Sequence, residues 1–110
     1  MILLVEQQKD AIVELCRRFN IERLYIFGSA ASDGFDDQRS DLDFLVKMAQ
    51  REPTGNYADR VLGLADGLEK LFERRVDLIT EESMRNPYFR SHVQATRQLV
   101  YEKPDQEAAA

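Results

Sequence analysis

The sequence predicts one α/β domain in which helices flank a small β-sheet. Three observations lead to this prediction. The chain has 110 residues, apolar residues recur at helical spacing in some segments, and short β-rich runs lie between those segments. A chain of this length buries roughly 65% of the surface that its unfolded form exposes, which is enough for a single core. We expect residues 1–103 to form the domain and residues 104–110 to form a flexible C-terminal tail.

The first half of this pattern is a helix followed by a strand. Residues 5–19 carry their apolar side chains on one stripe, which predicts an amphipathic helix ending near Asn20. Residues 23–27, RLYIF, form a short run of strand-forming residues that stops at Gly28.

Residues 29–40 are mostly polar and leave room for a short helix and a loop. Residues 41–48, DLDFLVKM, predict a second strand, and because it is apolar on both faces after Asp43 we expect it in the centre of the sheet. Residues 51–56 have turn chemistry, with Asn56 a candidate N-cap for the next helix.

The second half predicts a helix, a strand and a last helix. The apolar spacing over residues 57–72 fits a helix, and its two glycines indicate either close packing or tolerance. Residues 75–80, RVDLIT, predict a third strand. Asn86 and Pro87 have the chemistry of a cap and a first-turn proline, so a last helix is expected from there through Leu99.

The composition narrows the class of protein. Apolar residues make up 44% and charged residues 32% of the chain, as in globular proteins and unlike disordered or membrane-spanning ones. The formal net charge of -5 repels a phosphate backbone, so no direct nucleic-acid partner is expected. Cys16 is the sole cysteine, which rules out an intrachain disulfide, and no apolar run has the length of a signal peptide or membrane span. We therefore expect a cytoplasmic protein with no membrane partner.

Two aspartates at the start of the second strand need a physical explanation. In a strand, side chains at i and i+2 share a face, so Asp41 and Asp43 point the same way and Leu42 points into the other layer. Two carboxylates about 5 Å apart repel by roughly 3 kcal/mol at an effective dielectric near 20. A divalent cation offsets this repulsion, and oxygen ligands without a thiolate or histidine cluster favour magnesium or manganese.

Gly28 and Ser29 could bind an anion in the same site. A glycine at the end of a strand allows a tight turn, and a serine that opens a helix offers its hydroxyl and free N–H groups to an anion. A phosphate there would lie beside the metal, which points to a nucleoside triphosphate and to one further acid. Asp77, the lone charge in VDLIT, is the candidate, since an aspartate in a buried strand is costly unless it meets a cation or hydrogen-bond donors.

These residues resemble a known signature. GSAASDGFDDQRSDLDFLV with the later VDLIT is similar to the GS-x(n)-D-x-D pattern of the DNA polymerase β-like nucleotidyltransferases, with eleven residues between Ser29 and Asp41, one more than is usual there. In length the chain resembles the minimal nucleotidyltransferase (MNT) proteins, antitoxin partners of HEPN ribonuclease toxins. The resemblance implies a small mixed sheet flanked by helices, the polymerase β-like nucleotidyltransferase core.

The resemblance also implies roles for particular residues. Gly28 and Ser29 would grip the triphosphate of ATP, while Asp41, Asp43 and Asp77 would be catalytic and would hold two Mg²⁺ ions. Larger relatives hold their acceptors with extra domains, so we expect the acceptor here to be a protein. The resemblance implies a HEPN toxin, bound in a hetero-oligomer, that receives AMP on a tyrosine.

Two other functions stay open from the sequence. The chain could neutralise a toxin by binding alone, or it could be a stand-alone nucleotidyltransferase acting on a small molecule. His92, the one histidine, is expected to be a surface residue or a residue with its hydrogen bonds satisfied on the last helix.

Overall fold

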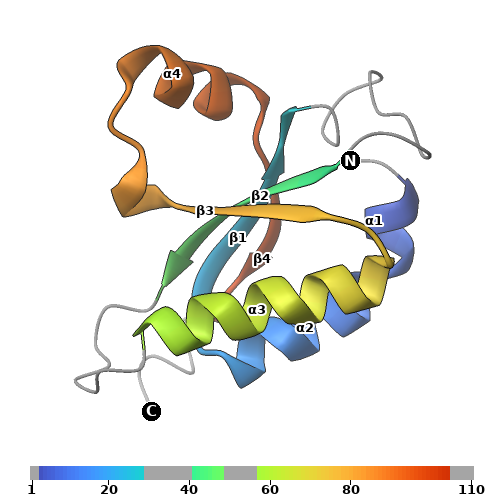
Figure 1. The fold of residues 1–110 in the computed structure, drawn as a ribbon. Coiled ribbons are helices and arrows are strands. Elements are labelled where there is room, and N and C mark those ends of the chain that lie inside the picture. The colour runs from blue at the N-terminus through green and yellow to red at the C-terminus, as the bar shows by residue number, and fades with distance from the viewer. Residues whose placement is uncertain (1–2, 29–40, 49–56, 105–110) are drawn as a thin grey trace.

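Figure 1 shows the fold in a computed structural model, which describes residues 3–28, 41–48 and 57–104. The elements follow in the order α1 (Leu3–Gln7), α2 (Lys9–Arg18), β1 (Ile21–Phe27), β2 (Leu42–Met48), α3 (Tyr57–Phe72), β3 (Val76–Thr80), the 3-10 helix η2 (Glu81–Ser83), α4 (Pro87–Thr96) and β4 (Gln98–Glu102). The predicted short helix and loop of residues 29–40, the candidate cap Asn56 and the expected tail from residue 105 onward lie outside the described residues.

The four strands form one mixed sheet in the order β3-β2-β1-β4. Strand β2 pairs parallel with β3 and antiparallel with β1, and β4 lies antiparallel on the other side of β1. The expected small mixed sheet is therefore confirmed, and β2 is central as its apolar sequence predicts.

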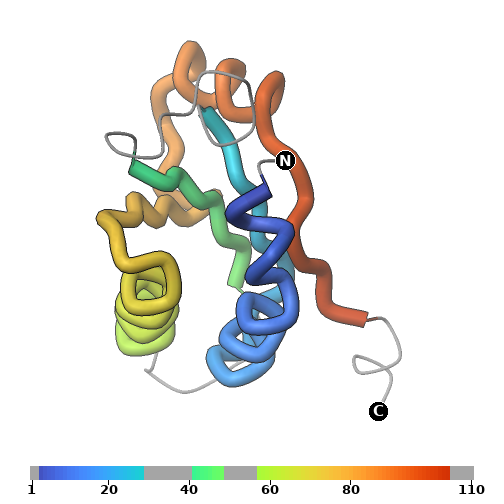
Figure 2. The backbone as a smooth tube through the Cα atoms, turned by 90° about the vertical axis from the view of Figure 1, so that its right-hand side faces the viewer, coloured from blue at the N-terminus to red at the C-terminus, as the bar shows by residue number. Residues whose placement is uncertain are grey.

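The helices cover the two faces of the sheet unequally. Figures 1 and 2 show α2 and α3 together on one side and α4 on the other. The larger core lies under α2 and α3 and includes Ile12, Leu24, Phe44 and Leu68, all fully buried. A smaller cluster lies on the α4 side and consists of Tyr25, Phe27, Leu45, Met84 and Val93.

The two glycines of α3 let α2 approach closely. A Cβ atom on Gly63 would lie 2.5 Å from the ring of Phe19, and one on Gly67 would lie 2.7 Å from the side chain of Leu15. Of the two explanations open from the sequence, close packing is confirmed.

The structure corrects the predicted N-terminal helix. The expected single helix over residues 5–19 is two helices, because Gln8 interrupts the run between α1 and α2. Val5 still points into the core from α1. None of the described helices is both long enough and apolar enough to cross a membrane.

The last helix also ends earlier than predicted, and a fourth strand follows it. Helix α4 ends at Thr96, not at Leu99, because Arg97 takes an extended backbone with φ -63° and ψ 144°. Residues 98–102 are rich in strand-forming side chains and pair with β1, which buries Val100 and Tyr101. Helical spacing alone could not separate this strand from the helix before it. The N-terminus of α4 is as predicted, since Asn86 Oδ1 accepts from the backbone N–H groups of Tyr88 and Phe89 and Pro87 is the first helical residue.

Candidate active site

The end of strand β1 is shaped by a glycine. Gly28 follows Phe27 with φ +68°, in the left-handed region that side chains disfavour. A Cβ atom at this position would also lie 2.9 Å from Oδ2 of Asp43. Glycine is therefore required twice here, for the backbone turn and for the approach of the Asp43 carboxylate.

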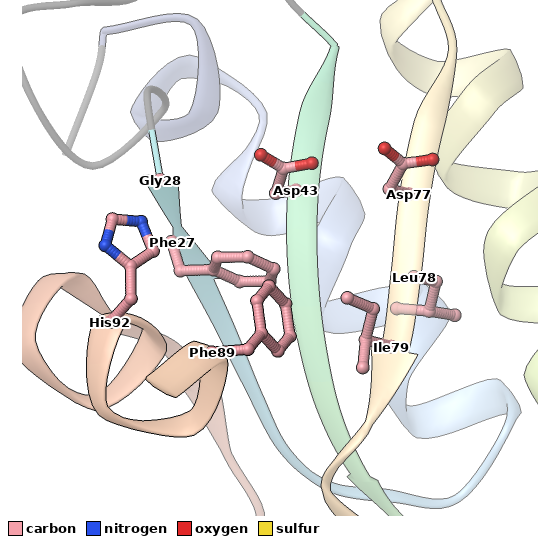
Figure 3. Close-up of a pocket in the computed structure, with 8 residues that line it drawn as sticks. All are labelled: Phe27, Gly28, Asp43, Asp77, Leu78, Ile79, Phe89 and His92. Carbon is pink, nitrogen blue, oxygen red and sulfur yellow. The ribbon is translucent and has the colours of Figure 1, made fainter. Parts of the chain in front are cut away.

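Adjacent strands place two carboxylates side by side. Asp43 on β2 pairs with Phe27 on β1 in the antiparallel register and with Asp77 on β3 in the parallel register. In Figure 3 the side chains of Asp43 and Asp77 lie at the same level of the sheet and reach into the same pocket. The parallel pairing of β2 with β3 brings these two acids together.

The surroundings of Asp43 raise its pKa. Burial, the nearby charge and hydrogen bond of Asp77, and the charge of Asp41 together raise the pKa of Asp43 from its ordinary value of 3.8 to about 6. Removing the carboxyl from water is the largest of these causes. An Asp43 with this pKa holds its proton more tightly in the folded protein than in the unfolded chain.

The pocket at this site has a volume of about 440 Å³. It has a polar part, with Asp43 and Asp77 in the middle and His92 on the side of Gly28, and an apolar part (Figure 3). Its lining consists of Phe27, Gly28, Asp43, Asp77, Leu78, Ile79, Phe89 and His92. The pocket thus combines paired carboxylates, a turn of backbone and an apolar surface.

Helix α4 contributes side chains to this site that the sequence reasoning did not assign to it. Phe89 and His92 both line the pocket, and His92 is exposed as expected. The signal was present in the spacing, because Phe89, His92, Val93 and Thr96 recur at i, i+3, i+4 and i+7 and share one face of α4. Which surface that face would cover depends on the tertiary fold.

A hydroxyl ties α4 to the end of β1. The backbone N–H of Gly28 donates to Thr96 Oγ1 at 3.3 Å, and Thr96 Oγ1 donates to the carbonyl oxygen of His92 at 3.0 Å. Thr96 thus connects the glycine turn to the last turn of the helix that carries Phe89 and His92.

The structure agrees with some of the remaining predictions for the site and not with others. Leu42 is fully buried in the larger core, as the alternation in the strand predicts. Asp41 precedes β2, is half-buried, and acts on Asp43 through its charge, but it does not line the pocket. The expectation that Asp77 lies in a buried strand is wrong, because β3 is an edge strand and Asp77 is exposed. Ser29 lies outside the described residues.

The donor set of the site suits a hard divalent cation. Carboxylate oxygens are the ligands that Mg²⁺ takes in proteins, and a cation would offset both the burial of the Asp43 carboxylate and its repulsion by Asp77 and Asp41. Within residues 3–28, 41–48 and 57–104, no cluster of three or more His, Cys, Asp or Glu side chains is close enough to hold a metal ion. The described geometry therefore offers a pair of carboxylates, Asp43 and Asp77, with Asp41 nearby.

The chain is similar to known nucleotidyltransferases. The model of the nucleotidyltransferase domain family matches residues 9–100. A protein of Methanocaldococcus jannaschii, named as a proposed protein adenylyltransferase, is 31% identical over 86 residues, which are 76% of this chain and 79% of the relative.

Two solved structures share the fold. One is a proposed minimal nucleotidyltransferase, 30% identical, with a TM-score of 0.61 and coverage of 84% of this chain and 89% of the other. The second comes from the complex of the tri-AMPylated HEPN toxin of Shewanella oneidensis with an MNT antitoxin. It is 18% identical, with a TM-score of 0.61 and coverage of 96% of this chain and 78% of the other.

Proposed function

Because the chain belongs to the nucleotidyltransferase domain family, we propose that it is the antitoxin of a HEPN/MNT toxin–antitoxin pair and that it transfers AMP from ATP to a tyrosine hydroxyl of the HEPN ribonuclease toxin. The observation that carries the proposal is the register of β1, β2 and β3, which sets Asp43 beside Asp77 and next to the turn at Gly28. The curated relative named as an adenylyltransferase and the AMPylated toxin bound to a neighbour of the same fold support the nucleotide and the protein partner.

The chemistry is the displacement of pyrophosphate by a hydroxyl. The tyrosine oxygen forms a bond to the α-phosphorus of ATP as the bond from that phosphorus to the oxygen bridging to the β-phosphate breaks. Pyrophosphate leaves, and the phenolic proton passes to a carboxylate, for which exposed Asp77 is our candidate. The attacking and leaving oxygens lie in line on opposite sides of the phosphorus.

We assign the residues as follows. Gly28 and Ser29 bind the triphosphate, because the glycine lets an anion approach the backbone closely and a serine offers its hydroxyl and N–H group to it. Asp41, Asp43 and Asp77 are the catalytic acids and would hold two Mg²⁺ ions, which when bound neutralise the charge of the phosphates. In the absence of cations, protonation of Asp43 below about pH 6 lessens its repulsion with Asp77.

The direct test is group transfer to the partner. The purified chain is mixed with a HEPN protein encoded beside it, Mg²⁺ and ATP labelled on the α-phosphate, and the label is followed on the HEPN protein. We expect label on a tyrosine, and we expect the variants Asp41→Asn and Asp43→Asn to abolish labelling while the two proteins still form a complex. Glu14→Gln, which removes an exposed acid from α2, serves as the matched control and should leave labelling unchanged.

The same experiment separates the rival functions. Unlabelled HEPN protein that is nevertheless inhibited, with inhibition kept in both aspartate variants, would mean neutralisation by binding alone. Turnover of ATP onto a small hydroxyl compound without any partner would identify a stand-alone enzyme. Omission of Mg²⁺ tests the metal assignment, since transfer at an undiminished rate in a chelator would contradict it.

A further inference from the structure

The apolar part of the pocket has no role in binding phosphates or cations. Besides Leu78, it consists of Phe27, Ile79 and Phe89, which come from β1, β3 and α4. The rings of Phe27 and Phe89 meet edge to face, with centroids 6.1 Å apart and an interplanar angle of 83°. Phe27 is only 4% exposed, whereas Phe89 is 36% exposed. Phe27 therefore supports Phe89, and Phe89 presents free ring surface at the pocket.

This apolar surface lies at a fixed distance from the acids. Ile79 follows Asp77 by two residues on the same face of β3, and a strand rises about 3.3 Å per residue, so the two side chains are separated by about 6.6 Å along the strand. The side chain of tyrosine spans roughly this distance from its Cβ atom to its hydroxyl oxygen. A ring resting on Ile79 and Phe89 would thus bring its oxygen to the level of Asp77 and Asp43, as the arrangement in Figure 3 allows.

An aliphatic hydroxyl fits the same surface poorly. The hydroxyl of serine or threonine is one carbon away from the Cα atom, so reaching the acids would carry the partner's polar backbone down against Phe89 and Ile79. Burying backbone N–H and C=O groups against apolar side chains without partners is costly. An aromatic ring instead gains apolar burial and an edge-to-face contact with Phe89.

We propose that Phe89 and Ile79, supported by Phe27, form an acceptor subsite that binds the ring of a phenolic substrate and so selects tyrosine over aliphatic hydroxyls. This inference rests on the proposed function, because it assigns the acceptor side of the same reaction. The in-line geometry agrees with it. With the triphosphate at Gly28, directly after β1, the acceptor enters from the side of β3, where Ile79 and Asp77 lie.

The test measures ligand binding and needs no turnover. N-acetyl-tyrosinamide, N-acetyl-serinamide and ATP are titrated separately into the full chain, and dissociation constants are taken from chemical shifts. We expect N-acetyl-tyrosinamide to bind more tightly than N-acetyl-serinamide and Phe89→Ala to weaken its binding about fivefold or more. Tyr88→Ala is the matched control, since it removes the neighbouring aromatic side chain of α4, which is 86% exposed and does not line the pocket.

Two results would overturn the inference. One is equal binding of N-acetyl-tyrosinamide by the wild type and Phe89→Ala, or none by the wild type. The other is weaker ATP binding in Phe89→Ala with N-acetyl-tyrosinamide unaffected, which would mean that the ring contacts the nucleobase. Phe89→Leu keeps an apolar side chain and should lose less affinity for N-acetyl-tyrosinamide than Phe89→Ala does. If Phe89→Ala does not fold, equal binding by the wild type and Phe89→Leu would overturn the inference. A chain that binds N-acetyl-tyrosinamide as expected but labels no HEPN protein would refute the proposed function and leave the subsite intact.

Discussion

Replacing Asp43 with asparagine should make the metal-free protein more stable at neutral pH. The folded protein raises the pKa of this carboxyl from 3.8 to about 6 by burying it and setting it beside Asp77 and Asp41. A group whose pKa is raised on folding is more stably folded when protonated, so its charged form destabilises the folded state. That cost is complete above about pH 6, declines as the pH falls, and is gone below about pH 4.

The size of the effect follows from the same shift. One pKa unit corresponds to about 1.4 kcal/mol, which gives a limit of about 3 kcal/mol for Asp43. Solvent around this half-buried carboxyl screens the interaction, so we expect about 1–2 kcal/mol for Asp43→Asn at pH 7.5. For a domain of this length that is an increase in Tm of about 4–8 °C.

Thermal and urea unfolding from pH 4 to pH 8 in a chelator would measure this difference. The stability of Asp43→Asn minus that of the wild type should be positive at pH 7.5 and close to zero at pH 4, while Glu14→Gln should show no such trend. Added Mg²⁺ should raise the Tm of the wild type and have little effect on Asp43→Asn. A destabilised Asp43→Asn at pH 7.5, or a gain that persists unchanged at pH 4, would refute the electrostatic reasoning.

Three further predictions concern the site and the packing of the helices. Gly28→Ala should lower the free energy of unfolding by about 1–3 kcal/mol in urea titrations and should abolish AMP transfer. Its Cβ atom would lie 2.9 Å from the Asp43 carboxylate, and the backbone there has a φ of +68°. A variant as stable as the wild type would contradict this. Gly63→Ala should cost about 1–3 kcal/mol, since its Cβ would meet the ring of Phe19 at 2.5 Å, and an unchanged Tm would disprove it. Thr96→Val should raise the KM for ATP, because the turn at Gly28 loses the hydroxyl that accepts its N–H and fixes its position, and Thr96→Ser should restore the KM. Equal kinetics in all three proteins would exclude a positioning role for Thr96.

The strand alternation and the glycine turn of the candidate site could be anticipated from the sequence, because both depend only on neighbouring residues. The spacing of Asp41, Leu42 and Asp43 sends alternate side chains to opposite faces of a strand, and Leu42 is indeed in the core. A glycine that ends an apolar run indicates a turn, and Gly28 has the positive φ that such a turn needs. These inferences require only the period of a strand and the conformational freedom of glycine.

The sequence did not predict strand β4 or the side chains that α4 contributes to the pocket. Residues 98–102 continue the apolar spacing of the helix before them, and their pairing with β1 is a contact between segments far apart in the sequence. Phe89 and His92 have helical spacing, but nothing in that spacing says that they line the pocket that holds Asp43.

The sequence by itself indicated the residue types of the candidate site and determined that Leu42 and Asp43 lie on opposite faces of a strand, because side-chain alternation and backbone freedom are properties of a few neighbouring residues. Only the tertiary structure decided that Asp77 stands beside Asp43 on an exposed edge strand, and that Phe89 and His92 of α4 share their pocket. The physical reason is that strand order and helix placement follow from the burial of the whole apolar surface, which no short segment specifies.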